Sequence, residues 1–159
     1  MYPVLLASHS LIRWLVLMSL VAATVHVWRS WKSGKKFTRS DDAIRHWTAT
    51  FAHIQMTIGL ILYFQSPVTA YFRENFGVAI HEREVRFFGL EHSLMMLTAV
   101  VILNVGSSLS KRRTSDQQKF KTLAVYFTIA LVIILANIPW AFSPLVSRPY
   151  YRTFQVERI

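Results

Sequence analysis

The sequence predicts an all-α integral membrane protein, built as a four-helix bundle. Three observations support this. Of the 159 residues, 53% are apolar and only 16% are charged; the apolar residues fall into four long runs; and most basic residues lie between those runs. A soluble domain scatters its apolar residues periodically, whereas a bilayer requires runs of roughly 20. The same composition is far too apolar for a disordered chain.

The four predicted spans cover residues 4–28, 47–64, 87–106 and 122–142, within one transmembrane domain of residues 1–159. A helix rises about 1.5 Å per residue, so each run can cross a hydrocarbon core roughly 30 Å thick, the second only just. The first run is longer than a signal peptide and contains Arg13, so we expect it to be retained. The chain has no cysteine, which excludes disulfides and thiolate metal sites.

Charges in the linkers predict the orientation. Basic residues dominate linkers 29–46 and 107–121, whereas acidic and basic residues balance in linker 65–86. The positive-inside rule then puts the basic linkers in the cytoplasm and both termini in the periplasm, as in a multi-pass protein of the bacterial inner membrane. Topology and anionic lipid account for the net charge of +10, so we expect no nucleic-acid partner. The basic residues are Arg29, Lys32, Lys35, Lys36, Arg39 and Arg45 in the first linker, and Lys111, Arg112, Arg113, Lys119 and Lys121 in the third.

The outer linker carries a helical pattern of its own. Ser66 and Pro67 suit an N-cap and a first helical position. Apolar side chains then recur at helical spacing, which predicts a short interfacial helix on the periplasmic surface. An irregular loop whose aromatic side chains touch lipid is the alternative. The recurring residues are Val68, Phe72, Phe76, Ala79 and Ile80.

Ionisable side chains inside the spans are the informative residues, because each costs at least about 2.5 kcal/mol in hydrocarbon. Counting from the span ends places His9 and His92 at nearly the same depth below the outer surface. Arg13 lies one turn deeper than His9, and Glu91 adjoins His92, so we expect an Arg13–Glu91 ion pair. The full set is His9, Arg13, His26, His53, Glu91 and His92, accompanied by Gln55 and Asn137.

Equal depth makes His9 and His92 the best candidates for axial haem ligands, since both ligands must reach one iron from facing helices. His53 lies near the middle of the second span, about 10 Å farther from the outer surface. The alternative is that each buried histidine only hydrogen-bonds a neighbouring helix. Met56, Met95 and Met96 place thioethers beside these imidazoles. Thioether and imidazole together suit Cu(I) or His/Met haem ligation. The alternative is that the methionines only fill gaps in the helix packing. The sequence assigns no role to His26, His46 and His81.

Two further patterns concern helix ends and close approaches. The segment Asn137-Ile138-Pro139-Trp140 predicts a kink or an end to the fourth span, because proline removes a backbone donor. Small residues near the histidines let helices pack tightly or let a flat ring approach the backbone. These small residues are Ala52 and Gly59 in the second span, and Gly89 and Ser93 in the third.

The chain resembles a family of small, mostly uncharacterised bacterial four-span membrane proteins that are often labelled cytochrome b-like. The matching pieces span most of the chain. The resemblance implies haem ligands among His9, His53 and His92, and one haem fits better than two, because no second pair of stacked histidines is evident. The pieces are His9-Ser10-Leu11-Ile12-Arg13-Trp14, Ala52-His53-Ile54-Gln55, Gly59-Leu60-Ile61-Leu62-Tyr63-Phe64, Glu91-His92 with Met95-Met96, and Ile138-Pro139-Trp140.

The first functional hypothesis is electron transfer by a b-type haem near the periplasmic side, with His9 and His92 as ligands and Arg13 neutralising a propionate. The second is an accessory subunit of a larger, respiratory-type membrane complex. A third is a site for quinone, bound by Gln55, His53 and Arg13, or for copper. No hydrolytic motif or phosphate loop is present in the sequence, so we expect a carrier or a subunit rather than a stand-alone enzyme.

Overall fold

The computed structural model describes residues 2–140, and this part of the chain is 88% helical with no strand. The helices are α1 (Tyr2–Lys32), α2 (Arg39–Gln65), α3 (Pro67–Glu74), α4 (Phe76–Ala79), α5 (Arg83–Arg86), a π-helical turn η1 (Phe87–Glu91), α6 (His92–Arg112) and α7 (Asp116–Asn137). The all-α prediction is therefore confirmed.

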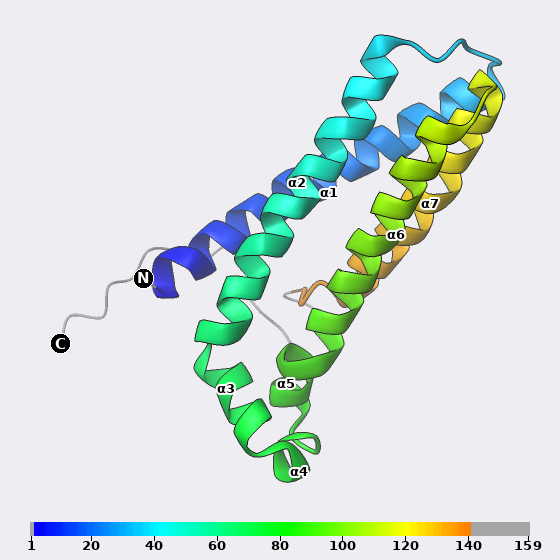
Figure 1. Ribbon diagram of the computed structural model, residues 1–159. Coiled ribbons are helices and arrows are strands. Elements are labelled where there is room, and N and C mark those ends of the chain that lie inside the picture. Colours follow the sequence, from blue (N-terminus) through cyan, green and yellow to red (C-terminus); the bar gives the residue numbers. More distant parts are fainter. Residues whose placement is uncertain (1, 141–159) are drawn as a thin grey trace.

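The four long helices pack in a closed order. α1 packs against α2 and α7, and α6 packs against α2 and, most extensively, α7. The short helices α3 to α5 gather at one end, and the α1–α2 and α6–α7 connections lie at the other (Figure 1). At Gly106 of α6, an added Cβ would lie 2.2 Å from Cβ of Tyr126. The close approach of α6 to α7 therefore requires glycine at this position.

Three helical segments in the described residues are long and apolar enough to cross a membrane: Tyr2–Lys32, Arg83–Arg112 and Asp116–Asn137. α2 has the length, at 27 residues, and contains the predicted span 47–64. Its composition is more polar because it includes His53, Gln55 and several threonines. The structure thus supports a membrane protein, with three of the four predicted spans meeting both criteria.

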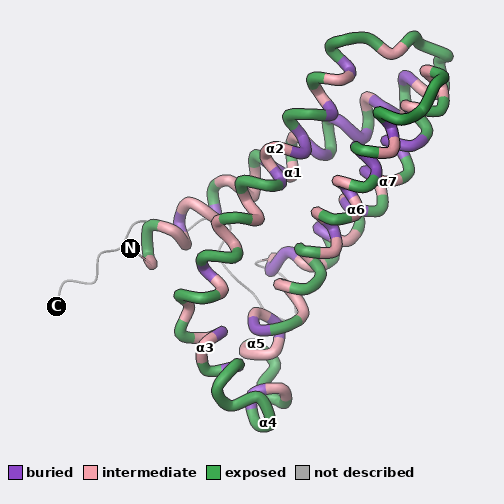
Figure 2. Tube along the Cα trace, in the orientation of Figure 1, coloured by how far each residue is buried: buried purple, intermediate pink, exposed green. Residues whose placement is uncertain are grey.

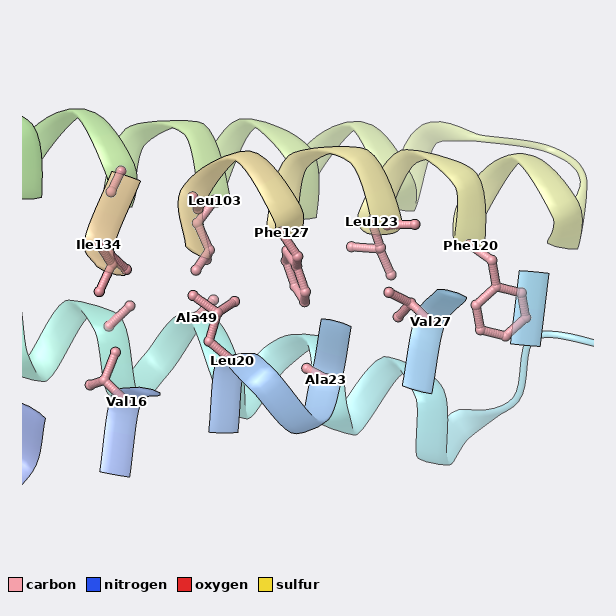
Figure 3. Packing of buried hydrophobic residues seen from close by; sticks show 14 of the residues in the cluster. Val16, Leu20, Ala23, Val27, Ala49, Leu103, Phe120, Leu123, Phe127 and Ile134 are labelled. Atoms are coloured by element: carbon pink, nitrogen blue, oxygen red, sulfur yellow. The ribbon is translucent and has the colours of Figure 1, made fainter. Parts of the chain in front are cut away.

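The core lies where α1, α6 and α7 face one another. Leu20, Leu103, Phe120, Leu123 and Phe127 are at most 1% exposed, and Figure 3 shows side chains of α1 and α7 pointing toward one another. Buried and exposed positions alternate along the long helices (Figure 2). The exposed positions are themselves apolar, such as Leu11, Met18 and Val132. Soluble proteins rarely present so much apolar surface, whereas lipid contact requires it.

Local signals set the helix ends. α2 begins with a capping box in which Thr38 and Asp41 bond each other's backbone amides. α3 begins with Pro67 at its first position after Ser66, as the sequence predicts. The helical pattern continues into α4 after a break at Asn75. α7 ends at Asn137, ahead of Pro139, which confirms that prediction; residues 141–142 of the predicted fourth span lie outside the described part.

Candidate functional site

A cavity of about 250 Å³ lies between α1, α2 and α6, toward the end of the bundle that carries α3. Both candidate ligands, His9 and His92, line it, so the structure brings these two residues together. Most of the wall is apolar. Its other polar side chains include Ser10, Arg13, Gln55, Ser66, Thr69 and Ser93.

His92 is oriented by the end of α7. Its Nδ1 lies 2.9 Å from the backbone carbonyl oxygen of Asn137. That carbonyl belongs to the last turn of α7, whose acceptors have no partner within the helix. Because a carbonyl only accepts, Nδ1 carries the proton and Nε2 keeps its lone pair. Nε2 has no hydrogen-bond partner among residues 2–140.

The π-helical turn directly precedes His92. The backbone amide of His92 donates to the carbonyl of Phe87, five residues back, and the hydroxyl of Ser93 donates to the carbonyl of Phe88 at 2.8 Å. The rings of Phe87 and Phe88 lie 5.7 and 6.1 Å from the imidazole. Such turns occur preferentially at functional sites. The sequence pattern did not indicate this one.

His9 lies against Gly59 of α2. A Cβ at Gly59 would lie 3.2 Å from Cε1 of His9, so the absence of a side chain there makes room for the ring. Gln55 donates through Nε2 to the backbone carbonyl of His9 at 2.9 Å. Within the described residues, His9 Nδ1 and Gln55 Oε1 are buried without a hydrogen-bond partner. A polar atom of this kind costs about 1–3 kcal/mol unless a ligand or water satisfies it.

Arg13 lines the same cavity, but Glu91 is not its partner. The guanidinium of Arg13 lies 5.4 Å from the centre of the Trp14 ring. Glu91 instead accepts from Nε of Arg86 at 2.7 Å. The predicted Arg13–Glu91 ion pair is therefore wrong. The reason is the π-helical turn, which brings residues five apart onto one side and so faces Glu91 toward Arg86.

His53 lies outside the cavity lining. It is exposed on α2, and its Nε2 lies 2.7 Å from Nδ2 of Asn104 on α6. As the amide nitrogen donates, Nε2 of His53 is the acceptor. The structure thus separates His53 from the haem and quinone sites for which the sequence made it a candidate. Met56 and Met96 line the cavity, whereas Met95 is 40% exposed on the outer surface.

His26 takes part in an ionic cluster that the sequence did not predict. Its Nε2 lies 2.6 Å from Oδ1 of Asp41, and Nζ of Lys35 lies 3.1 Å from the same oxygen. Burial raises the pKa of the Asp41 carboxyl, but hydrogen bonds from Thr38, His26 and Lys35 outweigh it and hold the pKa well below its usual range. The cluster joins α1 to the start of α2. His46 is exposed, with its ring 5.7 Å from that of Trp47.

In residues 2–140, no group of three or more His, Cys, Asp or Glu side chains is arranged to hold a metal ion. A haem iron needs only two axial protein ligands. Comparisons of the chain with protein-family models, curated protein sequences and solved structures found no match. The resemblance to cytochrome b-like proteins therefore depends on the sequence motifs alone.

Proposed function

We propose that the chain is a four-span protein of the bacterial inner membrane that holds one b-type haem between His9 and His92, near the periplasmic side. A single observation carries the proposal. Two imidazoles from different helices line one apolar cavity, and neither Nε2 has a hydrogen-bond partner among the described residues. A neutral imidazole with a free Nε2 is the usual histidine ligand of iron.

The four-span topology rests on α2 as the fourth crossing helix. At about 1.5 Å per residue its 27 residues extend roughly 40 Å, enough for the hydrocarbon core. It packs against α1 and α6, which both belong to segments that meet the criteria for spanning. Both termini are then periplasmic, and the two basic linkers are cytoplasmic.

Single cysteines test this topology directly, because the chain has none of its own. Ser40→Cys and Thr114→Cys report on the two basic linkers, and Gly77→Cys reports on the outer one. In intact cells a membrane-impermeant maleimide should label only Gly77→Cys. If α2 does not cross, residues 40 and 77 lie on the same side and label alike.

The donor set of the cavity fits a haem. Asn137 fixes the tautomer of His92 through its backbone carbonyl, as carbonyls that bond metal-bound histidines do in other proteins. Ligation through Nε2 of His9 would keep its proton on Nδ1. Gln55 already donates to the His9 backbone carbonyl, and its unpartnered Oε1 is an acceptor on the same side chain. The volume of about 250 Å³ lies below the roughly 300–1,000 Å³ of typical ligand pockets. A haem therefore requires the wall to widen, and Met56 and Met96, whose flexible side chains adapt to what they pack against, line it.

Bound there, a b-type haem supplies one-electron transfer. His9 and His92 would hold its iron, and the guanidinium of Arg13 would offer a cation to a propionate. The apolar wall excludes water, and the low dielectric strengthens that charge interaction. We expect this carrier to exchange electrons with a quinol or with a partner membrane protein.

The test is an oxidised and dithionite-reduced visible spectrum of the detergent-purified protein, made in cells with haem available. We expect a reduced b-type α band and about one haem per chain. His9→Ala and His92→Ala should each lose the haem while still inserting and folding. His53→Ala, which removes a histidine of the same helix bundle outside the cavity, is the matched control and should keep it. Unchanged haem in His92→Ala would remove this residue as a ligand.

A second candidate, a quinol site, is favoured by the buried acceptor Oε1 of Gln55. A quinol hydroxyl can donate to this oxygen, whereas the oxidised quinone carbonyl cannot. A folded but colourless protein would favour this candidate. Titration with a water-soluble quinol, followed by tryptophan fluorescence, should then show binding that Gln55→Leu weakens more for quinol than for quinone. A colourless protein that binds neither and copurifies with other subunits would instead be an accessory subunit.

A further inference from the structure

A second cavity, of about 360 Å³, lies at the end of the long helices opposite α3. Its lining comes from the start of α2, the end of α6 and the start of α7, next to the two basic linkers. Its volume falls within the range of about 300–1,000 Å³ that is typical of ligand sites. Its lining residues are Phe37, Thr38, Arg39, Asp42, Ser110, Lys111 and Lys119.

The cavity has an unbalanced positive charge. Arg39, Lys111 and Lys119 come from three different helices, and none of them has an ion-pair partner in residues 2–140. The single carboxylate in the lining, Asp42, already accepts from Nε of Arg45 at 2.8 Å. Arg45 is the main cause that lowers the pKa of the Asp42 carboxyl, and Lys111 lowers it further, so one carboxylate is shared among these cations. The cations in the lining still outnumber the carboxylate, so an anion in the cavity is stabilised.

The surrounding structure holds these cations in place. Nζ of Lys119 lies 5.3 Å from the centre of the Phe37 ring, which keeps this half-buried side chain beside the linker. The hydroxyl of Ser110 bonds the backbone carbonyl of Lys119 at 3.3 Å, joining the end of α6 to the start of α7.

We infer that this cavity binds the phosphate group of an anionic membrane lipid at the cytoplasmic face. Lipid is the favoured source because the three helices that supply the lining also carry exposed apolar side chains within two turns of it, at Trp47, Val105 and Val125. Basic pockets between membrane helices bind anionic headgroups in this way. Free inorganic phosphate shares the charge but gains nothing from the apolar helix surfaces. The inference rests on the proposed four-span topology and is independent of haem.

Native mass spectrometry of the detergent-solubilised protein tests it. Phosphatidylglycerol and phosphatidylcholine with the same acyl chains are added in turn, and bound lipid per chain is measured. We expect the wild type to retain phosphatidylglycerol preferentially. Lys111→Gln should weaken that retention about five-fold, the effect of one basic residue near a lipid surface. Arg112→Gln removes an equal charge from the adjacent residue, which does not line the cavity, and should change it little.

Each other outcome overturns the inference in a distinct way. If Lys111→Gln and Arg112→Gln lost phosphatidylglycerol to the same extent, the lipid would be held by the general charge of the linker and not by a site. Displacement of phosphatidylglycerol by an equal concentration of inorganic phosphate would assign the cavity to the free ion. The same measurement on His92→Ala separates the two sites, because loss of haem should leave lipid retention unchanged. The cysteine labelling described above tests the topology independently.

Discussion

The Nδ1 atom of His92 lies 2.9 Å from the backbone carbonyl oxygen of Asn137. This bond gives a candidate ligand of α6 its tautomer and gives the last turn of α7 a partner for one of its acceptors. The bond exists because α7 stops at Asn137, which Pro139 follows by two residues. One backbone feature, the end of a helix, therefore determines which imidazole nitrogen of His92 is available.

Two substitutions at His92 separate its structural role from ligation. His92→Phe removes the donor and leaves the Asn137 carbonyl unsatisfied, which should lower the free energy of unfolding by about 1–3 kcal/mol. His92→Gln retains an N–H donor and should recover much of that loss. Neither variant supplies an imidazole, so both should lack haem. Thermal unfolding of haem-free protein measures the structural role, and haem content measures ligation. If His92→Phe and His92→Gln were equally stable, the structural role would be contradicted.

Properties that depend on position along a helix could be predicted from the sequence. The helix starts at Ser66-Pro67 and the end before Pro139 depend on local backbone chemistry, and both are present. The rise per residue gives the approximate depth of His9 and His92 without any knowledge of neighbours. That both line one cavity depends on the packing order of the helices, which the structure supplies.

Properties that depend on rotation about a helix axis could not be predicted. The turn from Phe87 to Glu91 is π-helical. The extra residue in this turn rotates the Glu91 side chain away from its position in an ideal α-helix, and Glu91 pairs with Arg86. His53 and Gln55 are two residues apart and therefore lie on different faces of α2, one toward Asn104 and one at the cavity. Only the packing order of the helices decides which face meets the site.

Glu91→Gln tests whether Glu91 pairs with Arg86 and not with Arg13. Arg86 and Glu91 are 38% and 40% exposed, so their ion pair contributes no more than about 1 kcal/mol. Because Glu91 does not contact Arg13, we expect haem content and the reduced spectrum to be unchanged, with a small loss of thermal stability. A large shift of the α band in Glu91→Gln, absent from Arg86→Gln, would contradict the separation of Glu91 from the site.

The Asp41 cluster predicts the acid stability of the α1–α2 connection. A carboxyl with a lower pKa in the folded state stabilises the fold above its unfolded pKa of about 3.9, and this contribution is lost as the pH falls toward the folded value. Thermal unfolding measured between pH 3 and 7 should therefore show a loss of stability only at the acid end of this range. Asp41→Asn should lower stability at pH 7 by about 1–3 kcal/mol and reduce that acid dependence. Glu74→Gln, at the exposed end of α3, is the control and should leave the profile unchanged.

Gly59→Ala tests whether the position of the His9 ring controls haem binding. The added Cβ would lie 3.2 Å from Cε1 of His9, so the ring has to move by a few tenths of an ångström. Alanine also favours the helix by about 1 kcal/mol over glycine, so the free energy of unfolding should change little. Haem occupancy should fall and the midpoint potential should shift, because the ligand geometry changes while the fold does not. Gly77→Ala meets no atom within 4 Å and is the matched control. If both variants bound haem with the same occupancy and potential, His9 would not be held against Gly59 as a ligand.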